Sequence, residues 1–238
     1  MVFSLIRYNI SYYMKSVKYL PPVICFAAFL AINYQASPIG IWSNLHITAI
    51  AIFIFSSWVG MSFINSEDKT QQYITRLHVK NETAYHLSKI VSIVIFLVPF
   101  YVGTILMPVL YGSFVRRIHF GEILIYIAVH FLVSLLGVSV GIFFNLDLFS
   151  TEMAVLAYLL AMIVILVPFN IILSDNFVVV YAYYLLPPIN FLAERLHYLG
   201  DEVFLVDANF LVFVVYALGY ASVMIVLYNA VMQRRNKE

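Results

Sequence analysis

The residues NSEDKTQQYITRLHVKNETAYHLSK, Asn65–Lys89, form the only long polar stretch between two apolar segments of this chain. Asn65 or Ser66 can cap a first short helix, because their side-chain oxygens accept hydrogen bonds from free backbone N–H groups. Asn81 can cap a second helix in the same way, and that helix can continue into the next apolar segment. The stretch therefore predicts an elbow of two short helices outside the membrane.

The first helix of this elbow would carry an apolar face. Tyr73, Ile74 and Leu77 recur at helical spacing. Glu67 and Asp68 precede them, where negative charge suits the first turn of a helix. Two interpretations follow: a solvated helix lying on the bilayer surface, or a docking element that receives force from a soluble partner.

The composition places the chain among integral membrane proteins. It is 63% hydrophobic and 11% charged, with a mean hydropathy of +0.95. These values exclude an ordinary soluble domain. The formal net charge of +1 gives no reason to expect a nucleic-acid partner, and the single cysteine, Cys25, has no internal disulfide partner.

The apolar segments predict an all-α, polytopic membrane protein made of one domain, residues 1–238, with six membrane-spanning helices. The spans are expected at 19–36, 45–64, 90–110, 123–144, 153–173 and 210–232. Pro99 and Pro108 lie inside the third span, and either could kink its helix. The expected order along the chain starts with an interfacial helix (1–18), spans 1 and 2 (19–64) and the cytoplasmic elbow (65–89). Spans 3–5 (90–173), an extracellular re-entrant hairpin (174–207), and span 6 with its basic tail (208–238) follow. The hairpin is expected because the apolar run Phe177–Leu186 is too short to span a bilayer.

The distribution of cations predicts an orientation. Arg7, Lys15 and Lys18 lie beside an apolar stripe of the first helix, at the level of the lipid headgroups. Ten of the thirteen lysine and arginine residues lie in that helix, the elbow or the tail. The positive-inside rule therefore predicts that both termini and the elbow are cytoplasmic. Arg116 and Arg117 lie on the opposite side and count against this orientation.

The spans carry few groups that could do chemistry. His130 is the one ionisable residue near the centre of a span, and a lone histidine there more often packs or hydrogen-bonds than binds a ligand. We expect no metal site and no catalytic residue, because the sequence holds no HExxH and no paired intramembrane aspartates. It also lacks a P-loop, so the energy for any uphill transport would come from elsewhere. Gly137 and Gly141 permit close approach of a neighbouring helix.

Taken together, the layout resembles the ABC-2 type permeases, the membrane subunits of ATP-binding-cassette exporters. The elbow is the most specific part of this resemblance. It departs from the family pattern at Lys69, in place of a glycine, and at Val79–Lys80, in place of a proline. The matching positions are Glu67, Asp68, Thr70, the patch Tyr73–Leu77, Thr83 and Lys89.

The resemblance implies that the elbow docks onto a separate ABC ATPase subunit, present in two copies and carrying ATP and Mg²⁺. It further implies a homodimer, or a heterodimer with a related permease, in a bacterial cell membrane. Size and composition are similar to exporters of amphipathic or antimicrobial peptides, such as phenol-soluble modulin exporters. The residues that the resemblance assigns to ATPase coupling are Glu67, Asp68, Thr70, Tyr73, Ile74, Arg76, Leu77, Lys80, Thr83, Lys89 and, in a second loop, Asp147.

Two alternatives remain open from the sequence. The chain could be a membrane scaffold or sensor that transports nothing and recruits a cytoplasmic partner through the elbow. It could also be an intramembrane enzyme, which the shortage of catalytic groups disfavours and for which His130 is the discriminating residue.

Overall fold

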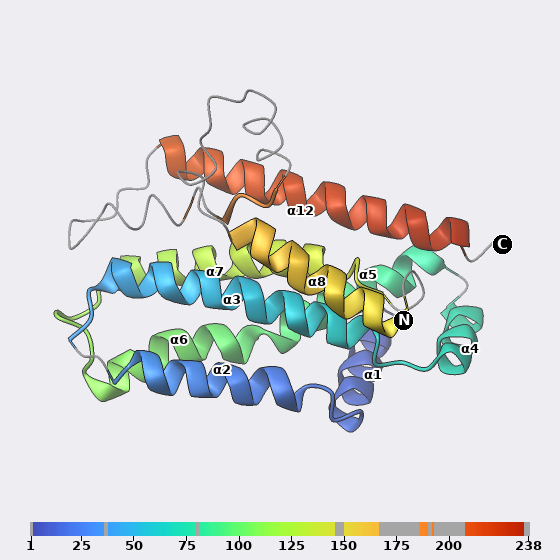
Figure 1. Ribbon diagram of the computed structural model, residues 1–238, viewed down its shortest axis with the longest axis horizontal. Helices are drawn as coiled ribbons and strands as arrows, with labels where there is room; N and C mark the ends of the chain where they lie inside the picture. The colour runs from blue at the N-terminus through green and yellow to red at the C-terminus, as the bar shows by residue number, and fades with distance from the viewer. Residues whose placement is uncertain are drawn as a thin grey trace.

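A computed structural model describes residues 2–35, 38–79, 81–145, 150–166, 186–189, 192 and 208–235 (Figure 1). Within these ranges the chain is helical, and its only β-type pairing is an isolated bridge between Ile39 and Phe114. The all-α prediction is therefore confirmed for the described residues. The helices are α1 (Val2–Lys15), α2 (Leu20–Asn33), α3 (Ile41–Ile64), α4 (Lys69–Val79), α5 (Glu82–Phe96), α6 (Val98–Tyr111), α7 (Phe120–Gly141), α8 (Thr151–Leu166) and α12 (Ala208–Arg235).

Four helical stretches are long and apolar enough to cross a membrane: Ile41–Ile64, Glu82–Tyr111, Phe120–Gly141 and Ala208–Arg235. Helices α1 and α2 add a fifth only if the pair, bent by 80°, is taken as one span. The first span was expected at 19–36, but α2 is shorter and has only 14 residues. Helix α8 is apolar but also short over its described residues. The described chain is thus a membrane-embedded helical protein with four or five candidate spans.

Prolines set two of the helix boundaries. Pro21 and Pro22 lie in the first turn of α2, where their missing N–H groups cost nothing. Pro99 lies in the first turn of α6, directly after the break at Leu97 that separates α6 from α5. The interruption lies next to one of the two prolines that were predicted to disturb the third span. Pro108 stays inside α6.

The corner between α1 and α2 has an unusual backbone. Val17 has φ of 61°, a conformation that a β-branched residue adopts only at a cost. The apolar stripe predicted for the first helix is partly wrong, because α1 buries Leu5, Asn9 and Tyr13, whereas Phe3 is exposed. The reason is that α1 packs on α5, and this contact selects its face.

Helices α3 and α7 make the most extensive interhelical contact. A Cβ atom built on Gly137 would lie 2.1 Å from Ser56 Oγ, and one on Gly141 would lie 2.1 Å from the Ser57 carbonyl oxygen. The two backbones therefore approach more closely than any residue with a side chain allows. We call this contact, formed by Ser56, Ser57, Gly137 and Gly141, the α3–α7 seam. It confirms the predicted close approach and identifies α3 as the neighbour.

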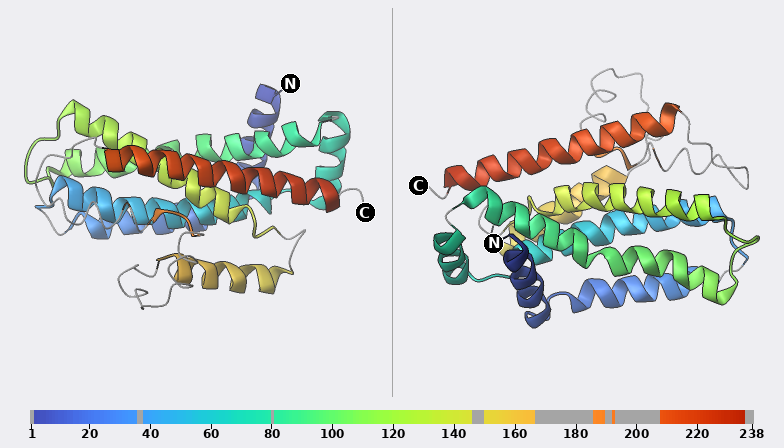
Figure 2. Two further views of the ribbon diagram at one scale, coloured as in Figure 1. Left: turned by 90° about the horizontal axis from the view of Figure 1, so that it is seen from above. Right: turned by 180° about the vertical axis from the view of Figure 1, so that it is seen from behind.

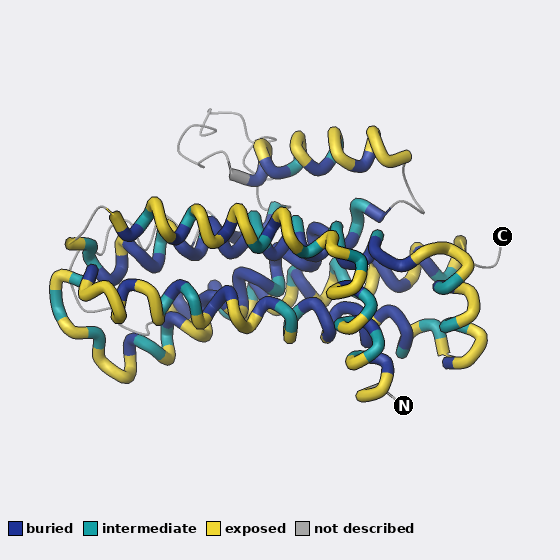
Figure 3. Tube along the Cα trace, turned by 90° about the horizontal axis from the view of Figure 1, so that it is seen from below, coloured by how far each residue is buried: buried dark blue, intermediate teal, exposed yellow. Residues whose placement is uncertain are grey.

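The two ends of the bundle differ. Helix α4, helix α1 and the C-terminal end of α12 lie at one end, while the α2–α3 turn and the α6–α7 loop lie at the other (Figures 1 and 2). Between the ends, the outward sides of the long helices are exposed and apolar (Figure 3). Such surfaces suit contact with lipid.

Candidate functional site

The elbow folds as two helices, but its first helix begins later than the sequence predicts. Helix α4 begins at Lys69, and the carbonyl of Asp68 accepts a hydrogen bond from Gln72 N at 2.8 Å. The predicted caps Asn65 and Ser66 are therefore wrong, since Ser66 Oγ instead donates to the Phe63 carbonyl at the end of α3. Glu67 consequently lies before α4 rather than in its first turn.

The second helix begins as predicted. Asn81 Oδ1 accepts a hydrogen bond from Ala84 N at 3.0 Å, which caps α5. Glu82 lies in the first turn, where its charge complements the helix dipole. Because α5 continues into the candidate span Glu82–Tyr111, the elbow is joined directly to a membrane-spanning segment.

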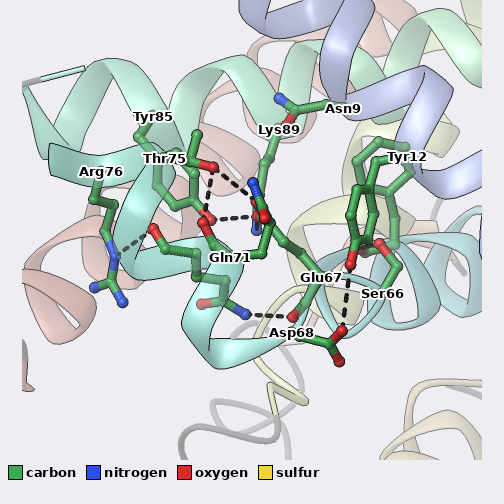
Figure 4. A network of polar contacts seen from close by, with 12 residues as sticks. Asn9, Tyr12, Ser66, Glu67, Asp68, Gln71, Thr75, Arg76, Tyr85 and Lys89 are labelled. Carbon is green, nitrogen blue, oxygen red and sulfur yellow. Dashed lines mark hydrogen bonds and ion pairs between the residues drawn. The ribbon is translucent and has the colours of Figure 1, made fainter. Parts of the chain in front are cut away.

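The carboxylate of Glu67 is the centre of a buried polar cluster (Figure 4). Its Oε2 lies 2.8 Å from Lys89 Nζ and accepts a hydrogen bond from the Tyr85 hydroxyl at 2.6 Å. Its Oε1 accepts hydrogen bonds from the Tyr8 hydroxyl at 3.0 Å and from Thr75 Oγ1 at 3.1 Å. We call these five residues the Glu67 junction. They bring α1, α4 and α5 to the segment that follows α3.

The ion pair at the centre of the junction is buried. The side chains of Glu67 and Lys89 are 3% and 5% exposed, and the Lys89 ammonium lies 4.7 Å from the centre of the Tyr85 ring. Burial acts to raise the pKa of Glu67. The Lys89 charge and the hydrogen bonds from Lys89, Tyr85 and Tyr8 act against burial and together hold this pKa below its ordinary value. Glu67 is therefore a carboxylate at neutral pH.

Further hydrogen bonds tie the surrounding segments to the junction. Gln72 Nε2 donates to the Glu67 carbonyl at 2.9 Å, which fixes α4 relative to the preceding loop. Asn65 Nδ2 donates to the Phe144 carbonyl at 2.9 Å, and Lys18 Nζ donates to the Asn65 carbonyl at 2.7 Å. The end of α3 is thus attached both to the segment after α7 and to the α1–α2 corner.

The outward face of α4 is apolar. Tyr73 and Leu77 are 61% and 58% exposed, and Ile74 is also exposed. The inward side buries Val79 and Gln72, and the Gln72 amide donates to the Glu67 carbonyl. Soluble helices usually bury their apolar residues, whereas α4 leaves three of them exposed. We call Tyr73, Ile74 and Leu77 the α4 face.

The residues assigned to coupling therefore divide into two groups. Glu67 and Lys89 are buried and paired with each other, so neither offers a side chain to a surface partner. Arg76 is half-buried, whereas Asp68, Thr70, Tyr73, Ile74, Leu77 and Thr83 are exposed, as are Arg7, Lys15 and Lys18 near α1. Lys80 and Asp147 lie outside the described residues, and so does nearly all of the predicted hairpin.

Sequence reasoning missed the partners of Glu67. Tyr8, Thr75 and Tyr85 come from three helices, and no local pattern connects them. One signal was available, because Tyr85 and Lys89 are four residues apart and so share a helix face. A buried carboxylate that faces this pair can accept a hydrogen bond from the tyrosine and neutralise the lysine.

His130 forms part of a separate polar cluster inside the bundle. Its Nδ1 lies 2.7 Å from the Tyr126 carbonyl, and its Nε2 lies 3.1 Å from Thr48 Oγ1. These contacts match the expected hydrogen-bonding role. Among the described residues, no group of three or more His, Cys, Asp or Glu side chains is placed to hold a metal ion.

No protein-family model matches the sequence, and no curated protein matches it at a significant level.

Proposed function

We propose that this chain is the membrane subunit of an ATP-binding-cassette exporter, and that the α4 face docks onto a separate ATPase subunit. The observation that supports this proposal most directly is the exposure of Tyr73, Ile74 and Leu77 on a helix that lies outside the apolar spans. Exposed apolar side chains gathered on one helix commonly mark a protein interaction surface. Three such residues at helical spacing suit insertion into a groove of a partner.

The Glu67 junction gives this docking surface a route into the membrane. Thr75, on α4, and Lys89, on α5, bind opposite oxygens of the same carboxylate. A displacement of α4 would therefore pull on α5 through Glu67. Because α5 is continuous with a candidate span, closure of the ATPases would tilt that span.

The remaining parts of the proposal extend beyond the described helices. The complete chain would have six spans, a re-entrant hairpin before the last, and both termini in the cytoplasm of a bacterial cell. The location of α1, α4 and the end of α12 at one end of the bundle supports a shared side (Figure 2). Two copies, or this chain and a related permease, would enclose the substrate route.

The proposed substrate is an amphipathic peptide or another hydrophobic solute. The outward surfaces of the long helices are apolar, so such a solute could enter from the bilayer. ATP and Mg²⁺ would bind the partner subunit, because this sequence has no P-loop. The chain would then contribute the route and the coupling but no catalysis.

Affinity purification of the tagged protein in mild detergent, followed by an ATP hydrolysis assay, tests this proposal. We expect an ATPase to co-purify with the native chain and to be lost from Leu77→Asp. Asn81→Asp is the matched control, because it adds the same charge to the elbow and aspartate also caps a helix well. This control should retain the ATPase.

The outcome also separates transport from scaffolding. A native preparation without any nucleotide-binding partner would contradict the transporter proposal. A soluble partner without ATPase activity, lost from Leu77→Asp, would instead support the alternative of a scaffold or sensor that uses the same surface.

A further inference from the structure

The end of the bundle opposite α4 contains a hollow of about 620 Å³ between the end of α6 and the loop that leads to α7. Its apolar lining includes Pro108, Val109, Phe114, Val115 and Ile118. The side chains of Arg116 and Arg117 also line it, and Arg117 is exposed. We call this space the α6–α7 hollow.

The wall of the hollow is held in place by backbone hydrogen bonds. Gly112, with φ of 62°, ends α6 in the left-handed conformation, and Ser113 N donates to the Pro108 carbonyl at 2.9 Å. Ile39 N donates to the Ser113 carbonyl at 2.7 Å, and Val115 N donates to the Ile39 carbonyl at 3.1 Å. The α2–α3 segment thus clamps the loop, which gives the hollow a defined shape.

The two arginines of the loop have different surroundings. Arg116 forms two hydrogen bonds to the Glu122 carboxylate, at 3.0 and 2.5 Å, and the same carboxylate accepts from His119 N at 2.8 Å. Its charge is therefore neutralised locally. Arg117 is exposed, and no acidic side chain among the described residues pairs with it. Within the described part of the chain, the loop consequently presents one positive charge without an acidic partner beside an apolar wall.

Neighbouring side chains place the hollow at the edge of the bilayer. Tyr111 and Phe120, at the ends of the two candidate spans, are 74% and 75% exposed. Aromatic residues at the ends of spans are typical of the membrane–water interface. Leu110 is exposed as well, so the flanking surface suits lipid better than water. A ligand in the hollow would have its polar part at headgroup level.

We propose that the α6–α7 hollow binds an anionic phospholipid. The Arg117 guanidinium donates hydrogen bonds to the phosphate, for which its planar fork is well suited. Val109, Val115 and Ile118 hold the upper part of an acyl chain. A free soluble anion would gain nothing from this apolar wall, and the bilayer beside the hollow supplies lipid continuously.

This binding site also accounts for an exception to the charge pattern. Arg117 lies away from the cations of α1, the elbow and the tail, where the positive-inside rule gives no reason for an arginine. A specific contact with an anionic lipid explains why an arginine lies there. The inference depends on the chain being embedded in a membrane, but it is independent of any ATPase partner.

Native mass spectrometry of the intact detergent-solubilised protein, titrated with defined lipids, tests the inference. We expect phosphatidylglycerol to bind more tightly than phosphatidylcholine. Arg117→Gln should weaken phosphatidylglycerol binding by about tenfold or more, as expected for loss of a charge-assisted hydrogen bond. Arg234→Gln, which removes the same charge from the exposed last turn of α12 at the opposite end of the bundle, is the matched control and should retain the affinity.

A second variant tests the apolar wall while keeping the charge. Val115→Trp should fill the hollow and also weaken phosphatidylglycerol binding, with an unchanged melting curve showing that the fold is intact.

Three results would overturn the inference. Equal losses in Arg117→Gln and Arg234→Gln would indicate nonspecific attraction of anionic lipid. Full competition by inorganic phosphate would indicate a site for a free anion, and tighter binding of an acidic amphipathic peptide would assign the hollow to peptide.

Discussion

The α3–α7 seam and the Glu67 junction hold helices together by opposite means. The seam uses glycine and serine, so that the two backbones touch at Gly137 and Gly141 without any charge. The junction uses an ion pair between Glu67 and Lys89, surrounded by hydroxyl donors from three helices. In a membrane, helices gain little from burying apolar surface against each other, so close backbone packing joins α3 to the C-terminal part of α7.

This difference indicates which region transmits movement. The seam is made of glycine backbone and two small serine residues, so α3 and α7 have little room to shift against each other. The junction connects separate helices through one carboxylate with four partners, and those partners lie on α1, α4 and α5. In the proposed coupling, α4 and α5 would move relative to α3 and α7.

The largest effect is expected from Lys89→Met, which leaves Glu67 buried without its cation. Removing one partner of a buried ion pair typically costs about 3–5 kcal/mol of stability. We expect a clearly lower melting temperature in detergent, measured by circular dichroism. The double variant Lys89→Met with Glu67→Gln removes both charges and should recover most of the loss. A melting temperature unchanged by Lys89→Met would show that the junction does not hold the elbow.

A smaller but clear effect is expected from Gly141→Ala in the seam. The added methyl group collides with the Ser57 carbonyl, and overpacking of this kind costs about 1–3 kcal/mol. Gly219→Ala, in α12, is the control because no atom of the described residues lies within 4 Å of the added atom. It should stabilise the protein by up to about 1 kcal/mol, since alanine favours helix. Equal melting shifts in the two variants would argue against the close approach of α3 and α7.

The junction, unlike the seam, should respond to pH. The pKa of Glu67 lies below its ordinary value of 4.5, so its contribution to stability is complete above that value. The contribution is lost as the pH falls through the lowered, folded-state pKa. Melting temperatures measured from pH 7 downward should therefore fall less steeply in the Lys89→Met, Glu67→Gln double variant than in the native chain. Parallel profiles would contradict the assignment.

The smallest effect is expected at the α1–α2 corner, outside both regions. Val17→Gly removes the cost of a left-handed conformation, which is about 1–2 kcal/mol for residues with a Cβ. Part of this gain is offset by the greater freedom of glycine in the unfolded chain. We expect a slightly raised melting temperature, whereas a marked fall would show that the Val17 side chain is needed for packing.

Much of the fold could be predicted from local patterns. The apolar runs located α3, α7 and α12, because a span must satisfy its backbone internally and is therefore helical. Pro99 marked the break before α6, and Asn81 marked the start of α5. The close approach at Gly137 and Gly141 was also predictable, since only small residues permit it.

The organisation of the elbow was less predictable. The sequence predicts that an acidic residue before a helix interacts with the helix dipole. Glu67 instead turns inward, because its interactions with Lys89 and three hydroxyl groups outweigh the cost of burying its charge. Tyr8 lies 59 positions away, so its contact with Glu67 depends on how α1 folds back. The face that α1 buries was likewise decided by α5 and not by its own periodicity.

Photo-crosslinking in living cells tests the central claim most directly, with a photoreactive amino acid placed at Leu77 and, as control, at Asn81. The account predicts that position 77 is joined to a protein which mass spectrometry identifies as an ATPase with a P-loop, and that position 81 gives far less of this adduct. Crosslinks from position 77 to lipid alone, or equal adducts from both positions, would contradict the claim that the α4 face is a docking surface.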